Sequence, residues 1–421
     1  MILSIVVAIF WLTLFVLWIW KGSFFKVQGF KKSLFLAAFG LKLIMAISFY
    51  IIYNYYPKYN RQSDSGTFYT ASKQLKEMVL KQSDLDLDQI PYWNLPYTYV
   101  TPNDTRQTVI YFAVLQLFTL NSKIATVLLV NILAFLGLFV LFKTFLILKL
   151  KPVPAFLGCF CVPSTLFWSS GLLKEVWLIF FLGFTLWNFV LFLEKHRLKN
   201  LTGFMIFALF LLTIKIYIGM ILIPLLIVFG ITEKFKIKPA VGYGTLLLVG
   251  FLGLFLIGHL NPEYNLLQVL TQKRNAFIRM VEAQEHYDIL LSSTSGSFMG
   301  FFKQTPLIFF NLLFKPFIFN TDKFLIFLAG FENFCFVVGI IGMLCFYKMP
   351  QNFKSAPWLF WIFILSVFVI IGYTTPNMGA LMRYKSPMLP FLTVLIASYW
   401  DISRFKIFLS RLPSVSRFFK F

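Results

Sequence analysis

The sequence predicts an all-α polytopic membrane protein with about eleven transmembrane helices. Of its 421 residues, 59% are hydrophobic and only 13% are charged, whereas a soluble domain usually carries about 25% charged residues. The mean hydropathy is +0.79, and the basic residues occur in short runs between long apolar stretches. Apolar surface of this extent requires lipid, and the spacing of the basic runs is typical of membrane topology.

Each predicted span is an apolar stretch of about the 20 residues that a helix needs to cross the hydrocarbon core. The predicted spans are residues 2–20, 33–53, 124–148, 153–172, 176–193, 201–214, 216–232, 239–259, 324–347, 357–373 and 387–400. They make the chain, 1–421, a single transmembrane domain. The first stretch has no basic region before it and no small-residue cleavage site after it, so a span is favoured over a signal peptide.

Basic segments between the spans set the orientation of the chain. They comprise Lys21 to Lys32, Lys143 to Lys151, Lys195 to Lys199, Lys234 to Lys238, Lys348 with Lys354, and Arg404 to Lys420. Cytoplasmic loops carry the excess of Lys and Arg, and two crossings separate each segment from the next. The N-terminus is therefore predicted outside and the C-terminus in the cytoplasm. This placement also argues against the nucleic-acid partner that a net charge of +22 would otherwise suggest.

Two long segments, 54–123 and 260–322, fall on the outer side in this topology. The first contains 107–120, which is apolar but short, so we expect it to lie on the outer membrane surface. In the second, apolar residues recur at helical spacing, at Leu267, Leu270, Phe277, Ile278 and Val281. We expect both segments to form surface helices that roof a cavity. The short predicted spans 201–214 and 216–232 are hinged at Lys215.

Asp64 lies shortly after the second predicted span, where another helical pattern begins. The apolar and small residues that follow it at helical spacing are Phe68, Ala71, Ser72, Leu75 and Met78. The carboxylate can cap a helix by accepting a backbone N–H, or it can be a general base held over a membrane cavity. The two roles are compatible, and both remain open.

Lys174 and Glu175 follow a run of small residues, 169–171, between two predicted spans. A structural pair would simply mark the turn between the helices. The small residues before it, however, allow a ligand or another helix to approach closely. A functional role for the pair therefore stands beside the structural one.

Several cations lie on the predicted outer side, against the usual orientation bias: Lys215, Lys273, Arg274, Arg279, Lys303, Lys315, Arg383 and Lys385. A guanidinium binds phosphate through two parallel hydrogen bonds, and a lysine acts as a point charge. Contact with lipid headgroups is the alternative for many of them. Arg383, just before the last predicted span, is the strongest candidate for phosphate binding.

The sequence gives no firm metal or cofactor site. The four cysteines and three histidines lack metal-ligand spacing. Asp84, Asp86 and Asp88 form an alternating acidic run in the first outer segment. A divalent cation could bind there, although an exposed, solvated loop is the simpler interpretation.

These features together resemble the membrane glycosyltransferases of the GT-C fold, notably bacterial relatives of the dolichyl-phosphate-mannose protein mannosyltransferases and of the lipid A aminoarabinose transferases. The resemblance rests on the early outer Asp64 and its aromatic and small-residue helix, on the acidic residue at Glu175, and on the Arg-Tyr-Lys-Ser-Pro run at 383–387. It covers most of the chain from about residue 33, through short and degenerate motifs.

The resemblance implies an enzyme of a bacterial inner membrane that moves a sugar from a polyprenyl-phosphate donor to a glycan, lipid or protein acceptor on the outer side. Asp64 would be the base, and Glu175 would place a sugar. Arg383, helped by Lys385 and Lys215, would hold the lipid phosphate. The further substrate contacts expected in this site are Lys174, Arg274 and Tyr69.

In the predicted topology the chain has an additional first span, 2–20, that the family lacks, and we expect no large outer domain after its last span. Two other functions remain open. An O-antigen-type polymerase or ligase would share the topology and the outer arginines, with less need for Asp64. A transporter of lipid-linked sugars would need polar residues and broken helices in the middle of the membrane, where this sequence is nearly all apolar, with Lys42 the main exception.

Overall fold

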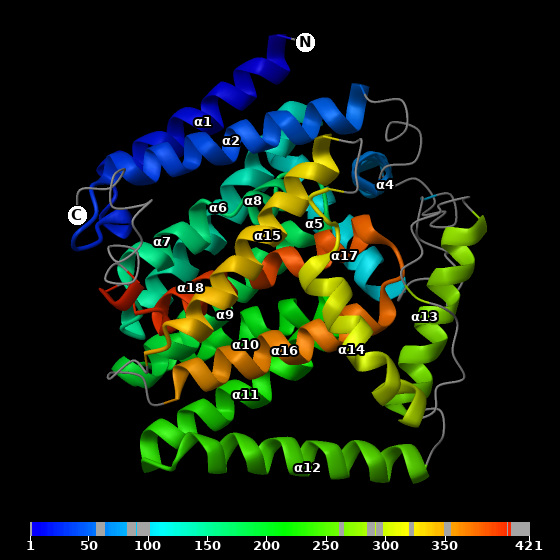
Figure 1. The fold of residues 1–421 in the computed structure, drawn as a ribbon. Helices are drawn as coiled ribbons and strands as arrows, with labels where there is room; N and C mark the ends of the chain where they lie inside the picture. Colours follow the sequence, from blue (N-terminus) through cyan, green and yellow to red (C-terminus); the bar gives the residue numbers. More distant parts are fainter. Residues whose placement is uncertain are drawn as a thin grey trace.

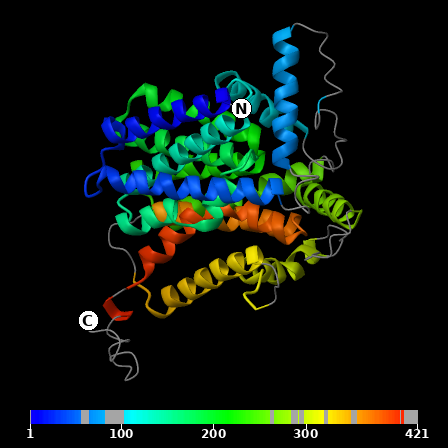
Figure 2. The ribbon, with the colours of Figure 1, turned by 90° about the horizontal axis from the view of Figure 1, so that it is seen from above.

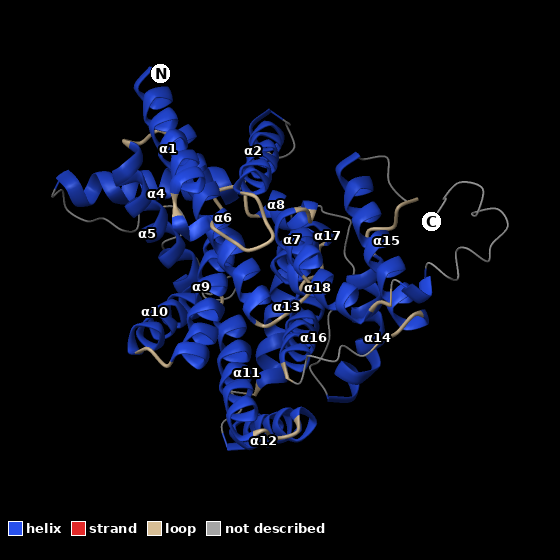
Figure 3. Ribbon diagram, turned by 90° about the vertical axis from the view of Figure 1, so that its left-hand side faces the viewer, coloured by secondary structure: helices blue, strands red, loops and turns tan. Residues whose placement is uncertain are grey.

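Long apolar helices, running side by side, make up the protein (Figure 1). The computed structural model describes residues 2–55, 64–81, 90, 102–260, 265–283, 291, 298–319, 324–348, 355–401 and 403–405, and these contain no β-strand (Figure 3). Eight helices among them are long and apolar enough to cross a membrane. The prediction of an all-α polytopic membrane protein is therefore confirmed at this level.

The elements follow one another along the chain as helices joined mostly by short links. They are α1 (Ile2–Lys21), η1 (Ser23–Phe25), α2 (Lys32–Tyr55), α4 (Asp64–Lys81), α5 (Pro102–Thr119), α6 (Lys123–Ile147), α7 (Pro152–Phe160), α8 (Pro163–Trp168), α9 (Lys174–Lys195), α10 (Leu198–Ile214), α11 (Ile216–Phe235), α12 (Pro239–Leu260), α13 (Leu266–Ala283), α14 (Phe298–Phe314), α15 (Phe324–Cys345), α16 (Ala356–Thr374), α17 (Met378–Lys385), η4 (Ser386–Met388) and α18 (Leu389–Tyr399).

Three of the predicted spans differ from the other eight. The eight qualifying helices are α1, α2, α6, α9, α11, α12, α15 and α16. The span expected at 201–214 is the 17-residue helix α10, the one expected at 387–400 is the 11-residue helix α18, and the one expected at 153–172 is divided into α7 and α8. The count of eleven therefore stays a prediction.

The break between α7 and α8 follows from a single proline. Pro163 has no backbone N–H and disfavours the helical conformation of the residue before it. Val162 accordingly has an extended backbone, with φ −79° and ψ 112°, and α8 begins at Pro163. Averaged hydropathy does not detect such a break, because both halves are apolar.

The core is formed around α6 and α9, whereas α12 lies along one edge of the molecule, opposite α1 and α2 (Figure 1). Inside the protein, 83% of the most apolar stretch of α6 is buried, against 6% for α12. Helices α6 and α9 cross at two glycines, where a Cβ on Gly137 would lie 2.6 Å from the carbonyl oxygen of Ile179. Small residues allow this close backbone approach, which is a common way for membrane helices to associate.

Both segments predicted on the outer side contain helices, α4 and α5 in the first and α13 and α14 in the second. Their position on the membrane surface stays a prediction. Helix α4 begins at Asp64, and the predicted inner face of it, including Phe68, Ala71 and Leu75, is buried. Helix α13 buries Ile278 and Val281. Viewed from above, α4 projects at one corner of the bundle, and α14 and α15 lie along another side (Figure 2).

Residues that the sequence assigns to one side of the membrane lie close together. On the predicted cytoplasmic side, the Lys151 ammonium donates to the carbonyl oxygen of Ala397 at 3.0 Å, and Lys348 forms an ion pair with Asp401 at 3.8 Å. Glu175 and Lys215 lie at the ends of α9 and α10 that are opposite to the predicted cytoplasmic segment Lys195 to Lys199. Asp64 and Arg383 meet them there, and we call this the Asp64 end. Which end faces the cytoplasm stays a prediction.

Candidate functional site

Four charged side chains from separate parts of the chain meet at the Asp64 end. The Arg383 Nε donates to Glu175 Oε2 at 2.8 Å, and its Nη1 donates to Asp64 Oδ2 at 2.6 Å. The Lys215 ammonium donates to the second oxygen of Glu175, Oε1, at 3.3 Å. We call Asp64, Glu175, Lys215 and Arg383 the charge cluster.

Each member of the cluster occupies the end of a helix. Asp64 and Glu175 lie in the first turns of α4 and α9, where the positive end of the helix dipole favours a carboxylate. Arg383 lies in the last turn of α17, where the dipole favours a cation. Lys215 has an extended backbone between α10 and α11, with φ −146° and ψ 91°, which confirms the predicted hinge.

Burial distinguishes Asp64 from its partners. The exposed fraction of the side chain is 0% for Glu175, 7% for Lys215, 13% for Arg383 and 47% for Asp64. Two carboxylates and two cations balance one another formally, so the cluster has no net charge. Asp64 is therefore the member that an external molecule can reach most directly.

The surroundings shift the titration of both cations. Burial alone would lower the pKa of Arg383, but the carboxylates of Glu175 and Asp64 raise it well above its ordinary value. Burial lowers the pKa of Lys215 to about 8, against the opposing attraction of Glu175. The Lys215 ammonium also lies 4.0 Å from the centre of the Tyr384 ring, a cation–π contact that favours the charged form.

Arg383 retains hydrogen-bonding capacity. A guanidinium has five N–H donors, and the two carboxylates use Nε and Nη1. Within the described ranges, no hydrogen bond from Nη2 is present. The side chain can therefore hold the two acids and still present a donor to a ligand.

Of the other predicted site residues, only Lys174 lies beside the cluster. Its ammonium donates to Thr105 Oγ1 at 2.8 Å, and its charge acts on Lys215. Lys385 instead is buried and donates to Asn333 Oδ1 at 2.6 Å, so the structure does not show it helping Arg383.

Arg274 and Tyr69 also have partners elsewhere. Arg274 is buried; it donates to Gln304 and lies 5.0 Å from the centre of the Tyr373 ring. The Tyr69 hydroxyl donates to the carbonyl oxygen of Asn121 at 2.6 Å. The structure therefore does not bring either of them to the charge cluster.

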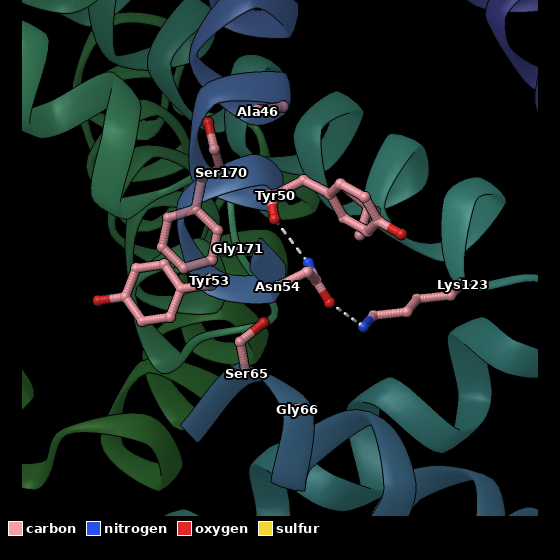
Figure 4. A pocket seen from close by; sticks show the side chains of 11 residues that line it. Ala46, Tyr50, Tyr53, Asn54, Ser65, Gly66, Lys123, Ser170 and Gly171 are labelled. Atoms are coloured by element: carbon pink, nitrogen blue, oxygen red, sulfur yellow. Dashed lines mark hydrogen bonds between the residues drawn. The ribbon is translucent and has the colours of Figure 1, made fainter. Parts of the chain in front are cut away.

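A small cavity that the sequence did not indicate lies between α2, α4, α6 and the link before α9. It is lined by Ala46, Phe49, Tyr50, Tyr53, Asn54, Ser65, Gly66, Lys123, Val127, Ser170 and Gly171, and its volume is about 80 Å³. We call it the Lys123 cavity. Figure 4 shows the Lys123 side chain extending toward Asn54, with the Ser65 hydroxyl on the other side of that amide. Ser65 directly follows Asp64, so the cavity adjoins the charge cluster along the chain.

Beneath this cavity a second cation is fully buried. The Lys42 ammonium donates to Ser169 Oγ at 2.7 Å, to Ser170 Oγ at 2.8 Å and to the carbonyl oxygen of Leu166 at 2.8 Å. Hydrogen bonds of this kind usually have a structural role, and here they fix the segment between α8 and α9 that leads to Glu175. The sequence marked Lys42 as an exception but gave no indication of its partners.

Comparison with protein-family models, with curated proteins and with solved structures finds no match. The functional argument therefore rests on the residues of this chain.

No metal site can be assigned. Among the residues that the structure describes, no group of three or more His, Cys, Asp or Glu side chains could hold a metal ion. The acidic run at Asp84, Asp86 and Asp88 lies outside the described residues.

Proposed function

We propose that the protein is a membrane glycosyltransferase of the GT-C type. It would take a sugar from a polyprenyl-phosphate donor and pass it to a glycan, lipid or protein acceptor on the non-cytoplasmic side of a bacterial inner membrane. The observation that carries this proposal is the charge cluster, in which Asp64 is half-exposed and held by Arg383, itself anchored on the buried Glu175. A half-exposed carboxylate in a fixed position suits proton removal from an acceptor.

The proposed reaction exchanges one bond of the anomeric carbon for another. The acceptor hydroxyl oxygen forms a bond with that carbon, and Asp64 takes the hydroxyl proton. The bond between the carbon and the donor phosphate oxygen breaks, and its electron pair leaves with the polyprenyl phosphate. Fixed donors near the leaving oxygen stabilise the charge that develops there, and Arg383 Nη2 is available for this contact.

Glu175 has a different part in this proposal from the one that the family resemblance implied. Its side chain is fully buried and both oxygens accept hydrogen bonds from cations. It is therefore a positioning residue, which orients Arg383 and Lys215, and is not a contact for a sugar.

The two alternatives make different demands on the same residues. A polymerase or ligase would depend on Arg383 and tolerate the loss of Asp64. One observation favours a transporter: the predicted span 153–172 is broken into α7 and α8, and the buried Lys42 binds the carbonyl oxygen of Leu166 in α8. Discontinuous helices often form transport sites. A transporter would not need a general base.

The test is Asp64→Asn, which keeps the shape of the side chain and loses its basicity. Loss of a general base costs about 10²–10⁴ in rate, and Asn remains a good helix cap. Membranes that contain the variant should therefore release polyprenyl phosphate from a sugar-loaded donor far more slowly than wild type, in the presence of an envelope extract as acceptor.

Glu77→Gln is the matched control, because Glu77 lies on the same helix and is 41% exposed in an ion pair with Lys73. It should transfer at the wild-type rate. Thermal unfolding of both purified variants separates loss of chemistry from loss of fold. A folded Asp64→Asn protein with normal transfer would reject Asp64 as the base and favour the polymerase or the transporter.

A further inference from the structure

The Lys123 cavity has an unbalanced positive charge. Among the described residues that line it, Lys123 is the one with a charge, and none is a carboxylate. Lys42 lies behind Ser170 and bonds only uncharged oxygen atoms. In the described part of the chain neither lysine forms an ion pair. The four members of the neighbouring charge cluster balance one another, whereas the described lining of the cavity has a cation without a counterion, which favours an anion there.

Lys123 has unused donors at this cavity. An ammonium has three N–H donors, and one of them binds Asn54 Oδ1 at 2.8 Å. The Tyr50 and Tyr69 rings lie 5.5 Å and 5.8 Å from the nitrogen atom, and no other hydrogen bond of it is present within the described ranges. Because half-buried charges are costly without a counterion, this arrangement suits a ligand that brings a negative charge and acceptor oxygens.

The size of the cavity limits what can enter it. Its volume of about 80 Å³ exceeds the ~30 Å³ share of one water molecule. It falls well below the ~300 Å³ of the smallest pockets that enclose a whole organic ligand. A single compact group therefore fits, while the rest of the molecule must remain outside.

We propose that the Lys123 cavity binds a phosphoryl group, with Lys123 as its direct ligand and Lys42 as the charge behind it. Ser65 offers a hydroxyl at the same cavity (Figure 4). The expected source is the phosphate of the lipid-linked donor, an assignment that rests on the proposed function. Arg383 would then act on Asp64, Glu175 and the leaving oxygen, while the cavity holds the phosphoryl group itself.

The test is lipid binding, measured without any transfer reaction. Purified protein in detergent is titrated with polyprenyl monophosphate, with polyprenol, with phosphatidylglycerol and with inorganic phosphate. Wild type should bind polyprenyl phosphate more tightly than polyprenol. Lys123→Met should weaken phosphate binding about tenfold or more, the value of a charge-assisted hydrogen bond, and leave polyprenol binding unchanged. Lys123→Arg should retain most of the affinity.

Two further variants make the test independent of how well Lys123→Met folds. Asn54→Asp places a carboxylate where the amide oxygen now accepts from Lys123 at 2.8 Å, so it should neutralise the lysine and abolish the preference for phosphate. Lys76→Met is the matched control, because Lys76 donates to Asn121 at 2.6 Å and does not line the cavity. It should bind as wild type does.

The ligand series identifies the source of the phosphoryl group. Tightest binding of polyprenyl phosphate assigns it to the donor lipid, whereas equal binding of phosphatidylglycerol or of inorganic phosphate assigns it to a phospholipid or to free phosphate. Wild-type affinity for every phosphate compound in Lys123→Met and Asn54→Asp would overturn the proposal. Asp64→Asn should still bind polyprenyl phosphate, so a failure of the transfer proposal is distinguishable from a failure of this one.

Discussion

Replacing Glu175 by Gln removes the one carboxylate that contacts both Arg383 and Lys215 in the described structure. Both of these cations are largely buried, with 13% and 7% of their side chains exposed. Asp64 still pairs with Arg383 at 2.6 Å, and the Gln carbonyl can accept one hydrogen bond. The residual cost therefore falls mainly on Lys215, which is left as a buried charge without a counterion.

Removing one partner of a buried ion pair costs about 3–5 kcal/mol of unfolding free energy. Because Asp64 and the Gln carbonyl compensate in part, we expect a loss near the lower end, about 3 kcal/mol. Glu194→Gln, at the exposed far end of the same helix, should change the unfolding free energy by less than about 0.5 kcal/mol.

The loss of unfolding free energy in Glu175→Gln should become smaller as the pH rises. Burial already lowers the pKa of Lys215 in the folded protein, and Glu175 opposes that shift, so removing Glu175 lowers the folded pKa further below the unfolded value. Between these two values the unfolded chain binds more protons than the folded chain, and stability then rises with pH. The difference in unfolding free energy between the variant and wild type should therefore be large at pH 6 and small towards pH 9.

Reversible denaturation in mixed micelles at pH 6 and pH 9 measures these differences. A Glu175→Gln variant as stable as wild type at pH 6 would refute the buried ion-pair reasoning. A deficit that widens as the pH rises would refute the assignment of the cost to Lys215.

Three further outcomes are expected. Arg383→Lys keeps a charge but not the two-pronged guanidinium that binds two carboxylates, so the transfer rate should fall. Arg383→Gln should lower the transfer rate about 10²-fold. Wild-type activity in both variants would remove the residue from the site. Gly183→Val should destabilise the protein by about 1–3 kcal/mol, because a Cβ there meets the backbone of α6, whereas Gly244→Val, with nothing within 4 Å, should be tolerated. Cysteines introduced at Ser83 and Ser292 should react with a membrane-impermeant thiol reagent in intact cells, and labelling only after lysis would invert the predicted topology.

Local pattern was sufficient to predict several parts of the fold. The start of α4 at Asp64 and the hinge at Lys215 both follow the sequence predictions. Each depends on periodicity or on a single residue between two apolar stretches, which are properties of neighbouring residues. The break at Val162 and Pro163 also has a local cause, the proline. The prediction of one span there used only length and hydropathy, which do not register a proline.

Pairing between helices could not be predicted in the same way. The family resemblance implies that Lys385 helps Arg383 to hold a phosphate, yet residues two apart on a helix face different directions. Arg383 accordingly contacts Glu175 and Asp64, while Lys385 contacts Asn333 and the carbonyl oxygen of Leu312.

The sequence by itself determined that this is a helical membrane protein, and its predicted topology placed Asp64, Glu175, Lys215 and Arg383 at one end. Only the tertiary structure decided that these four form a chain of ion pairs and that Glu175 is fully buried while Asp64 is half-exposed. It also decided that Lys123 borders a cavity with no carboxylate among its described lining residues. The physical reason is that burial and pairing depend on the register and rotation of helices distant in the chain. Hydropathy specifies which residues enter the membrane, and close packing between helices specifies which of them meet.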